Sequence, residues 1–503
     1  MKRRELLHLG AALAIKGLAE NSNIGEVGPI ESSARQPATP PFAFPSILAS
    51  SDDHRRRLQN IAECNRRIKK CLFQQLILDY LPVQVAYNLG EYPLKPWKDP
   101  DQQDEQQLDE LSNAGVELIH LHDEWNDSKR LFGGDKFTPV NERGFRKFIQ
   151  IAQARKMKVT VYASSGYFER GDPDFRPEWA RTANDLVEIY WHLAHCSPAS
   201  PSWRAYLLPR LLRLMDEYGV DGLYNDLGYD PLYKSRALPA CDEISAFKES
   251  ENEDGALGDL LSIIYQEVKR RGGIVKVHRG NVQYPHTPDK VYDYLWVGEA
   301  TKDLDAMREA VKMNPRYVVP CSDLSQGAKL EREDDLYLHS IPYLQFPLLM
   351  AGRPFTGERS VVPGFKYAQD GPDGWTAIAQ KVWRYFQSHP DGPYTYGWWD
   401  SCPGRSEARA TYYRWLRLYR PLVQSGTQAY IELVDSDFFV KPSHAKVVAS
   451  VFAHRDLYLV LANYSRAGVT VETRDPFFAC DQLSSPPSTR WPLKARTLVI
   501  LKR

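Results

Sequence analysis

The sequence has no excess of charge of either sign, because 64 Lys and Arg residues balance 64 Asp and Glu residues over 503 positions. A chain without a net positive field is not expected to bind nucleic acid or an anionic membrane surface. Beyond the amino terminus, no apolar stretch reaches the length of about 18 residues that a membrane-spanning helix needs. The GxGxxG and GxxxxGK[ST] loops that cradle phosphate groups are also absent. These absences argue against nucleic-acid partners, stable membrane insertion and the common nucleotide-binding folds.

Cysteine is sparse as well, with seven residues and no CxxC pair. Neither a zinc ribbon nor a thioredoxin-like site is therefore predicted. Cys64 and Cys71 fall in one predicted helix, where a rise of about 10 Å separates them. That rise is beyond the usual reach of a disulfide. Most of the cysteines are expected to be small buried hydrophobic residues.

Aromatic residues, in contrast, are abundant, with 12 Trp and 28 Tyr beside 35 Pro. Flat aromatic faces next to polar groups are typical of a sugar-binding cleft, but Tyr and Trp also serve plain packing. The 43% hydrophobic and 25% charged composition is that of an ordinary soluble globular protein. The composition therefore favours a globular protein with a carbohydrate site as one hypothesis to weigh against packing.

The amino terminus resembles an export signal. A Lys-Arg-Arg triplet at residues 2–4 is followed by an apolar stretch at 9–15 and by Gly17-Leu18-Ala19, a plausible cleavage region. This arrangement is similar to a twin-arginine signal, and the alternative is a basic amphipathic helix. Residues 20–45 are rich in Ser, Pro, Gly and Asn, which is typical of a linker. We therefore predict a signal and linker over residues 1–45 and a bacterial protein that is periplasmic or secreted.

From residue 83 onward, apolar β-branched runs and helical patterns alternate. This succession predicts an α/β fold, a (β/α)8 TIM-like barrel over residues 83–425. Seven strands are predicted, at Val83–Asn88, Val116–His122, Lys158–Ser164, Gly222–Asp226, Ile274–His278, Tyr294–Glu299 and Tyr317–Cys321. The eighth strand is ambiguous between Arg353–Thr356 and Tyr394–Trp399.

The remaining elements are predicted in the same way. The barrel helices are expected at Gln102–Ala114, Glu142–Lys156, Trp203–Tyr218, Gly258–Arg271, Leu304–Met313 and Asp335–Leu349. A charged helix from about Asp52 to Leu78 makes residues 46–82 an N-terminal helical segment. Short alternating strands make residues 426–503 a small C-terminal antiparallel β-sandwich, with strands at Lys446–Phe452, Tyr458–Asn463, Val469–Thr473 and Ala495–Leu501.

Side-chain alternation indicates which residues face the barrel interior. Successive strand residues face opposite ways, so one set fills the interior and the other packs under the helices. In four predicted strands the helix-facing set is apolar and the inward set is polar: His120 and His122; Thr160, Tyr162 and Ser164; Tyr224 and Asp226; Lys276 and His278. The polar residues gather toward the carboxyl ends of the strands, where barrel enzymes build their sites. For any single residue the alternative is a solvated strand end.

Two carboxylates are the candidate catalytic residues. Asp226 ends the fourth predicted strand, and Glu299 ends the sixth, near Trp296. An apolar neighbour can raise the pKa of a carboxyl group enough for general-acid work. Glycoside cleavage needs a proton donor and a second carboxylate, about 5 to 5.5 Å apart for retention and 6.5 to 9.5 Å for inversion. The alternatives are a cap or turn residue for each, and Glu299 shares the helix-facing alternation unless Gly298 introduces a bulge.

The DGLYND segment at 221–226, the WVGEA segment at 296–300 and a barrel followed by a β-sandwich resemble the α-galactosidase superfamily of retaining glycoside hydrolases. The resemblance covers about residues 83–503. It implies Asp226 as the nucleophile and Glu299 as the acid/base. Better-known members have a Lys two residues before the nucleophile, where this chain has Tyr224, and usually an Asp as acid/base. They also often carry an N-terminal β-domain, where this chain offers only a predicted helix. Because of these departures, galactose and α-anomer preference are not carried over.

Further residues fit substrate-binding roles. Lys276 and His278 can bind hydroxyls or keep Asp226 ionised, and Asp323 can replace Glu299 as the acid. The remaining candidates surround the strand ends and are His122, Glu124, Trp125, Tyr162, Tyr224, Trp296 and Trp398. The segments that hold Trp125 and Trp398 can equally be a polar surface loop and plain packing, respectively.

We therefore predict a retaining glycosidase that acts on an oligo- or polysaccharide with no metal or organic cofactor. The principal alternative is a non-catalytic carbohydrate-binding barrel, which would share the aromatic residues without needing both carboxylates. A metal-dependent barrel hydrolase or lyase is less favoured, because His120 and His122 have no further ligands at suitable spacing. The sugar, the anomer and the oligomeric state are left open.

Overall fold

A computed structural model of the chain describes residues 52–78, 83–89, 99–121, 125, 137–139, 141–169, 172–180, 193–226, 253–278, 290–297, 304–305, 319–322, 332–352, 409–442, 444–482 and 484–503. The predicted export signal and linker at residues 1–45 lie outside these ranges, so they stay predictions. Within the described ranges, no helix is both long and apolar enough to cross a bilayer.

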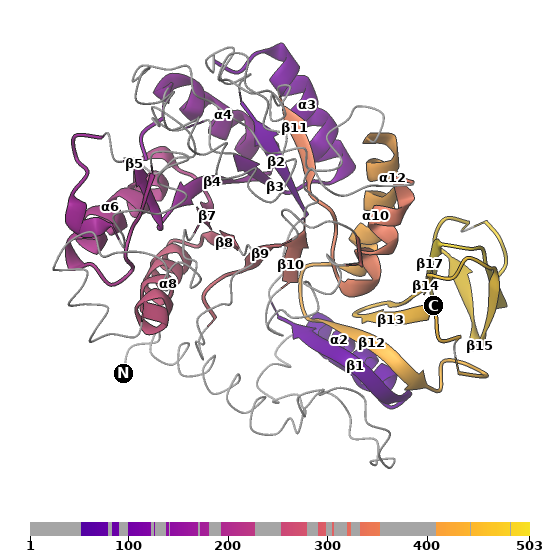
Figure 1. Ribbon diagram of the computed structural model, residues 1–503. Helices are drawn as coiled ribbons and strands as arrows, with labels where there is room; N and C mark the ends of the chain where they lie inside the picture. The colour runs from indigo at the N-terminus through magenta and orange to yellow at the C-terminus, as the bar shows by residue number, and fades with distance from the viewer. Residues whose placement is uncertain are drawn as a thin grey trace, which may run out of the picture.

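The centre of the fold is an eight-stranded parallel sheet of the (β/α)8 type, as predicted (Figure 1). Its hydrogen-bonded order is β10-β9-β8-β7-β4-β3-β2-β11, so seven strands follow chain order and β11 returns to pair with β2. The strands are β2 Gln84–Asn88, β3 Leu118–Leu121, β4 Lys158–Ser164, β7 Gly222–Asp226, β8 Ile274–His278, β9 Tyr294–Val297, β10 Val319–Ser322 and β11 Leu349–Gly352. The seven predicted strands are therefore confirmed, three of them with the same bounds.

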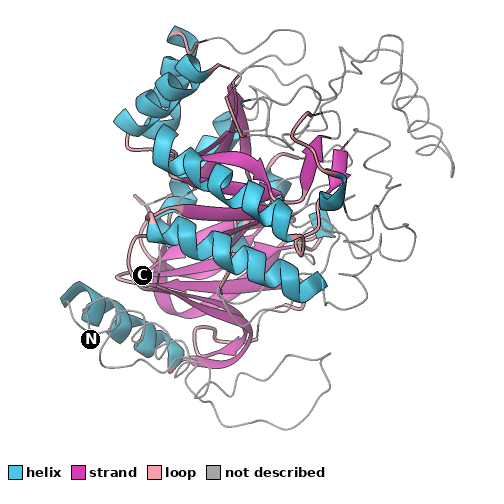
Figure 2. Ribbon diagram, turned by 90° about the vertical axis from the view of Figure 1, so that its left-hand side faces the viewer, coloured by secondary structure: helices cyan, strands magenta, loops and turns pink. Residues whose placement is uncertain are grey.

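Helices connect the strands and cover the outside of the sheet (Figure 2). They are α3 Gln102–Ala114, α4 Glu142–Ala154, α6 Pro201–Tyr218 and α8 Glu253–Arg270. Local chemistry fixes where they begin: Asp101 forms a capping box with Asp104 at α3, and the Ser200 side chain caps α6 ahead of Pro201. The predicted helix at Leu304–Met313 lies outside the described residues except for positions 304 and 305.

The segment before the eighth strand differs from the prediction of one helix over Asp335–Leu349. The structure has a short helix α10 Asp334–Leu338, a 3-10 turn η5 Ile341–Tyr343 and then the strand β11. Pro342 and Pro347 explain the difference, because proline removes a backbone donor and interrupts a helix. The eighth strand thus ends just before Arg353, the start of one of the two predicted alternatives. Both alternatives, Arg353–Thr356 and Tyr394–Trp399, lie outside the described residues.

A small hairpin interrupts the path from β4 to α6. It consists of β5 Tyr167–Glu169 and β6 Leu193–His195, and the 3-10 turn η3 Pro177–Trp179 lies between them in the chain. Aromatic rings pack edge to face around this hairpin. The ring centroid of Phe168 lies 5.1 Å from that of Trp179 and 5.7 Å from that of Trp203 on α6. Part of the aromatic richness of the sequence therefore serves core packing.

The carboxyl-terminal strands form a separate antiparallel sheet beside the barrel (Figure 1). They follow α12 Arg409–Tyr419 and η7 Arg420–Leu422 and comprise β12 Gln428–Ser436, β13 Val447–Ala453, β14 Leu457–Asn463, β15 Val469–Ala479, β16 Ser488–Leu493 and β17 Thr497–Lys502. Each predicted strand is present. One face packs on the barrel, where the Tyr430 hydroxyl and Ser450 Oγ both donate to the Pro342 carbonyl.

The amino-terminal segment is not entirely helical, in contrast to the prediction. Helix α2 ends at Asn65, and residues 68–77 form a strand, β1 Ile68–Ile77, that pairs antiparallel with β12 at the edge of the C-terminal sheet. Local sequence does not reveal this pairing, since strand formation depends on the neighbouring strand. Cys64 and Cys71 consequently lie in different elements.

Candidate active site

The side-chain alternation predicted for the barrel strands is confirmed. One apolar cluster contains the helix-facing residues, including Ile119, Val161, Leu223 and Val277. A separate buried cluster fills the barrel interior, with members Ala86, Leu118, Tyr162, Tyr224, Ile274, Tyr294, Trp296 and Leu348. The polar candidates on the strands therefore converge inside the barrel.

Asp226 lies at the carboxyl end of β7 and is held by the two neighbouring strands. The Tyr162 hydroxyl on β4 donates a hydrogen bond to Oδ2 at 2.7 Å. Nδ1 of His278 on β8 lies 3.3 Å from Oδ1, and it is the donor when Asp226 is ionised, because a carboxylate can only accept. The Asp226 side chain retains 17% exposure. The carboxylate is thus oriented on both oxygens and still accessible.

The backbone of Asp226 is fixed by a turn that follows β4. Ser164 Oγ donates to the Asp226 carbonyl at 2.9 Å, and the Ser165 amide donates to the same oxygen at 3.1 Å. The Ser165 amide also reaches Oδ1 of Asn225 at 2.9 Å. Sequence reasoning missed Ser165 and Asn225. The available signal was Asn225 itself, a polar residue on the otherwise apolar, helix-facing side of β7.

Aromatic rings form the floor beneath Asp226. Tyr224 stacks on Trp296 with centroids 5.2 Å apart, and it meets Tyr162 and His120 edge to face at 5.6 and 4.6 Å. All four side chains are buried. Tyr162, Tyr224 and Trp296 therefore support the carboxylate from inside the barrel rather than offering open faces to a ligand.

A buried cation lies within the same floor. The Lys276 ammonium donates to Oε1 of Gln84 at 3.0 Å and lies 3.9 Å from the ring centroid of Trp296. Gln84, at the start of β2, was not among the predicted site residues. No local signal marks it, because its role depends on which strand faces β8 across the barrel.

The other predicted site residues fall in two groups. Trp125 has no exposed surface; its Nε1 donates to the Tyr162 carbonyl at 2.9 Å and its ring stacks on Phe145. It acts here as a packing residue behind β4. The remaining candidates lie outside the described residues: His122, Glu124, Glu299, Asp323 and Trp398. Asp226 is therefore the member of the predicted carboxylate pair that the structure places.

Metal-ligating side chains do not cluster in the part of the chain that the structure describes: no group of three or more His, Cys, Asp or Glu residues there is arranged to hold a metal ion. His120, one of the two histidines considered for a metal site, packs against the rings of Tyr224 and Trp296.

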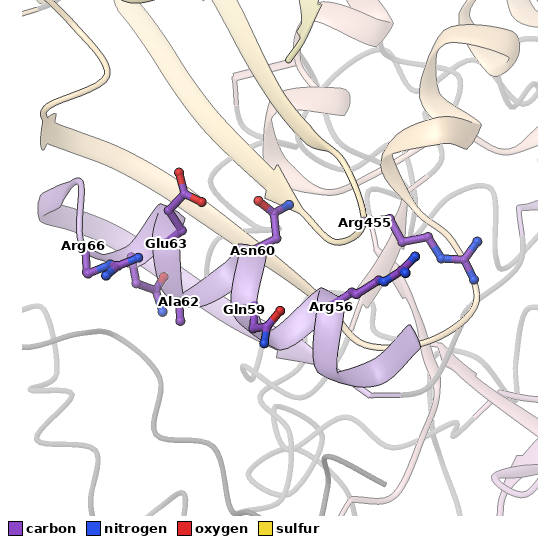
Figure 3. Close-up of a pocket in the computed structure, with 8 residues that line it drawn as sticks. Arg56, Gln59, Asn60, Ala62, Glu63, Arg66 and Arg455 are labelled. Atoms are coloured by element: carbon purple, nitrogen blue, oxygen red, sulfur yellow. The ribbon is translucent and has the colours of Figure 1, made fainter. Parts of the chain in front are cut away.

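A hollow lies along α2 Asp52–Asn65 (Figure 3). Its volume is about 810 Å³, and its lining is polar and charged: Arg56, Gln59, Asn60, Ala62, Glu63, Asn65, Arg66 and Arg455. This lining contains no aromatic face on which a sugar ring can stack. We therefore place the candidate active site at Asp226 and not in this hollow.

No protein-family model matches the sequence, and no curated protein is detectably similar to it. Solved structures are similar in fold. The α-glucosyl transfer enzyme XgtA gives a TM-score of 0.52 at 12% identity, covering 83% of this chain and 98% of that chain. An inactive double mutant of the trehalulose synthase MutB gives 0.50 at 11% identity, covering 83% and 99%.

The maltogenic α-amylase AmyB from Thermotoga neapolitana gives a lower TM-score of 0.46 at 12% identity, covering 84% of this chain and 98% of that chain. At identities this low, structural similarity shows the fold alone and leaves the activity open. The chain is thus similar in fold to XgtA and MutB, and it consists of a parallel TIM-type barrel followed by an antiparallel sheet.

Proposed function

We propose that this protein is a glycoside hydrolase whose nucleophile is Asp226. The observation that carries the proposal is the setting of this carboxylate: it ends the fourth barrel strand, remains accessible, and has one oxygen hydrogen-bonded by Tyr162 and the other facing His278. Donors to the charged form of a carboxyl group favour ionisation, which a nucleophile needs at neutral pH. Barrel enzymes build their sites at this face of the fold.

The proposed reaction uses Glu299 as the second carboxyl group. Glu299 donates its proton to the glycosidic oxygen while an oxygen of Asp226 attacks the anomeric carbon, so the bond to the leaving group breaks and a glycosyl ester forms. Glu299 then takes a proton from water, which attacks the same carbon and releases the sugar and Asp226. Two inversions give net retention. Asp323 is the alternative acid.

The substrate is proposed to be an oligo- or polysaccharide. The sequence motifs and the similar structures suggest different sugars. The sequence motifs resemble α-galactosidases, whereas the similar structures include an α-glucosyl transfer enzyme. Export to the periplasm or beyond, proposed from residues 1–45, would bring the protein to such polymers. Galactosides and glucosides of both anomers therefore belong in one test, together with acceptor sugars that reveal transfer.

The test is hydrolysis of aryl α- and β-glycosides and of oligosaccharides by the wild type, Asp226→Asn and a matched control, Asp259→Asn. Asp259 is an exposed carboxylate on helix α8 that pairs with Arg204 at 2.5 Å. The proposal predicts that Asp226→Asn loses at least about a thousandfold in kcat/KM while the control keeps its activity. If no glycoside is cleaved but a glycan binds to the wild type, the carbohydrate-binding barrel replaces the enzyme.

A further inference from the structure

Lys276 occupies an unusual position for a charged residue, in the middle of β8 with its side chain inside the barrel and only 1% exposed. Its partner Gln84 is on β2. In the order β2-β3-β4-β7-β8 these strands are four places apart in an eight-stranded sheet, so they face each other across the interior. The hydrogen bond between them holds the ammonium group near the barrel axis.

Contacts of this ammonium offset part of the free-energy cost of burying its charge. Its Nζ lies 3.9 Å from the ring centroid of Trp296 and 4.9 Å from that of Tyr224, distances at which a cation is attracted to an aromatic face. The amide oxygen of Gln84 solvates the ammonium without adding a negative charge. A positive charge in a space filled by aromatic rings acts over a longer distance than it does in water.

The register of the sheet places Lys276 on the strand next to Asp226 and below its level in the barrel. Lys276 is the pairing partner of Tyr224, and Tyr224 precedes Asp226 by two residues on β7. Two residues along a strand correspond to about 7 Å. Because Lys276 is buried within the aromatic floor, it does not reach a sugar in the mouth of the barrel. Of its two predicted roles, hydroxyl binding is therefore not supported.

We propose that the buried ammonium of Lys276, held on the barrel axis by Gln84, keeps Asp226 ionised without touching the substrate. Lys276 is thus a positioning residue that acts through Asp226. Its catalytic consequence rests on the proposed function, whereas its electrostatic effect on Asp226 does not. Among the residues whose side chains the structure describes, the other titratable groups that face this interior are His120 on β3, Tyr162 on β4, Tyr224 on β7, His278 on β8 and Tyr294 on β9.

The test measures the pKa of Asp226 itself, by NMR titration of its ¹³C-labelled carboxyl carbon, assigned with Asp226→Asn. Lys276→Met removes the charge at similar volume and is expected to raise the apparent pKa of Asp226 by about one unit or more. Gln84→Glu keeps Lys276 but adds a negative charge beside it, and it is expected to raise the same pKa. Gln84→Met removes the acceptor that holds the ammonium and is expected to raise the same pKa by less than Lys276→Met does. Lys269→Met, at a lysine on α8 that pairs with Asp293, is the matched control and is expected to leave that pKa unchanged.

Two further measurements separate the possible outcomes. His278→Gln, titrated alone and with Lys276→Met, separates the contribution of the His278 ring, which contacts Asp226, from that of Lys276. An Asp226 pKa that stays the same in both Lys276→Met and Gln84→Glu overturns the inference, and Gln84→Glu decides the matter if Lys276→Met does not fold. In an active enzyme the acidic limb of kcat/KM moves upward with the NMR value. If the NMR value moves but no glycoside is cleaved, the inference stands and the proposed function fails.

Discussion

The Tyr162 hydroxyl donates to Oδ2 of Asp226 at 2.7 Å, a contact between the ends of two adjacent strands, β4 and β7. Tyr162 pairs with Tyr224 in the parallel sheet. The Tyr162 side chain therefore extends toward Asp226, which lies two residues further along β7. Because the Tyr162 side chain is buried, packing fixes the orientation of its ring, and its hydroxyl points at the Asp226 carboxylate. Such support from a rigid neighbour is what holds a catalytic carboxylate in a productive orientation.

Tyr162→Phe is therefore expected to reduce kcat/KM while the protein stays folded. A hydrogen bond to a charged group contributes about 1.5 to 3 kcal/mol, which corresponds to a loss of about 10- to 150-fold if it is made fully in the transition state. Steady-state kinetics on the best aryl glycoside measure the loss. Tyr206→Phe is the matched control, since this tyrosine lies on helix α6 and its hydroxyl bonds a different aspartate, Asp174, at 3.1 Å. Equal losses in both variants would contradict a specific role for Tyr162.

Gly222→Ala is expected to destabilise the barrel because β7 and β8 approach closely at this residue. A Cβ at Gly222 would lie 2.0 Å from the carbonyl oxygen of Ile274, a backbone atom that cannot rotate away. Overpacking of this kind costs about 1 to 3 kcal/mol of unfolding free energy. Denaturant unfolding followed by Trp fluorescence measures it.

Gly468→Ala is the control for this change. A Cβ there meets only the Leu493 carbonyl oxygen at 3.5 Å, an ordinary contact, so little change in the free energy of unfolding is expected. Similar unfolding midpoints for the two variants would show that β7 can move away from β8. That result would weaken the description of Asp226 as a rigidly held group.

Much of the barrel could be predicted from sequence because its strands are short apolar runs with clear breaks. The bounds of β4, β7 and β8 match, and the alternation along them correctly placed Asp226, Tyr162 and Lys276 inside. Long-range partners could not be predicted: β1 is a strand because it meets β12, and Gln84 matters because it meets Lys276. The complete burial of Trp125 could likewise not be predicted, since aromatic residues of loops and of the core share the same sequence pattern.

The stability of the C-terminal sheet is expected to fall in mild acid because of His454. Burial lowers the pKa of His454 from 6.5 to about 4. Its neutral ring satisfies both nitrogens: Nε2 donates to the Pro421 carbonyl at 2.9 Å, and Nδ1 accepts from the Asp456 amide at 3.4 Å. Protonation would place an N–H group against that amide donor. Between about pH 6.5 and 4 the unfolded chain therefore binds one more proton than the folded chain, and stability decreases as the pH falls.

His454→Gln removes this dependence, because glutamine offers a donor and an acceptor without titrating. From pH 7 to pH 5 the wild type is expected to lose about 2 kcal/mol more unfolding free energy than the variant. Urea unfolding at the two pH values measures the difference. His444→Gln, at an exposed histidine before β13, is the control and should follow the wild type. Parallel pH profiles for the wild type and His454→Gln would show that another group dominates acid unfolding.

Rescue by an external nucleophile should assign the two carboxylates to separate roles. Asp226→Ala leaves space where the attacking oxygen was, while Glu299 still donates its proton to the leaving group. Azide can then attack the anomeric carbon of an aryl glycoside from the side where the Asp226 carboxylate was. The product is expected to be a glycosyl azide of inverted configuration, visible by proton NMR. Glu299→Ala keeps the nucleophile, so azide instead attacks the glycosyl ester and gives the retained configuration. If Asp323 is the acid, Asp323→Ala gives the retained azide and Glu299→Ala does not. An inverted azide from both carboxylate variants would contradict Asp226 as the sole nucleophile.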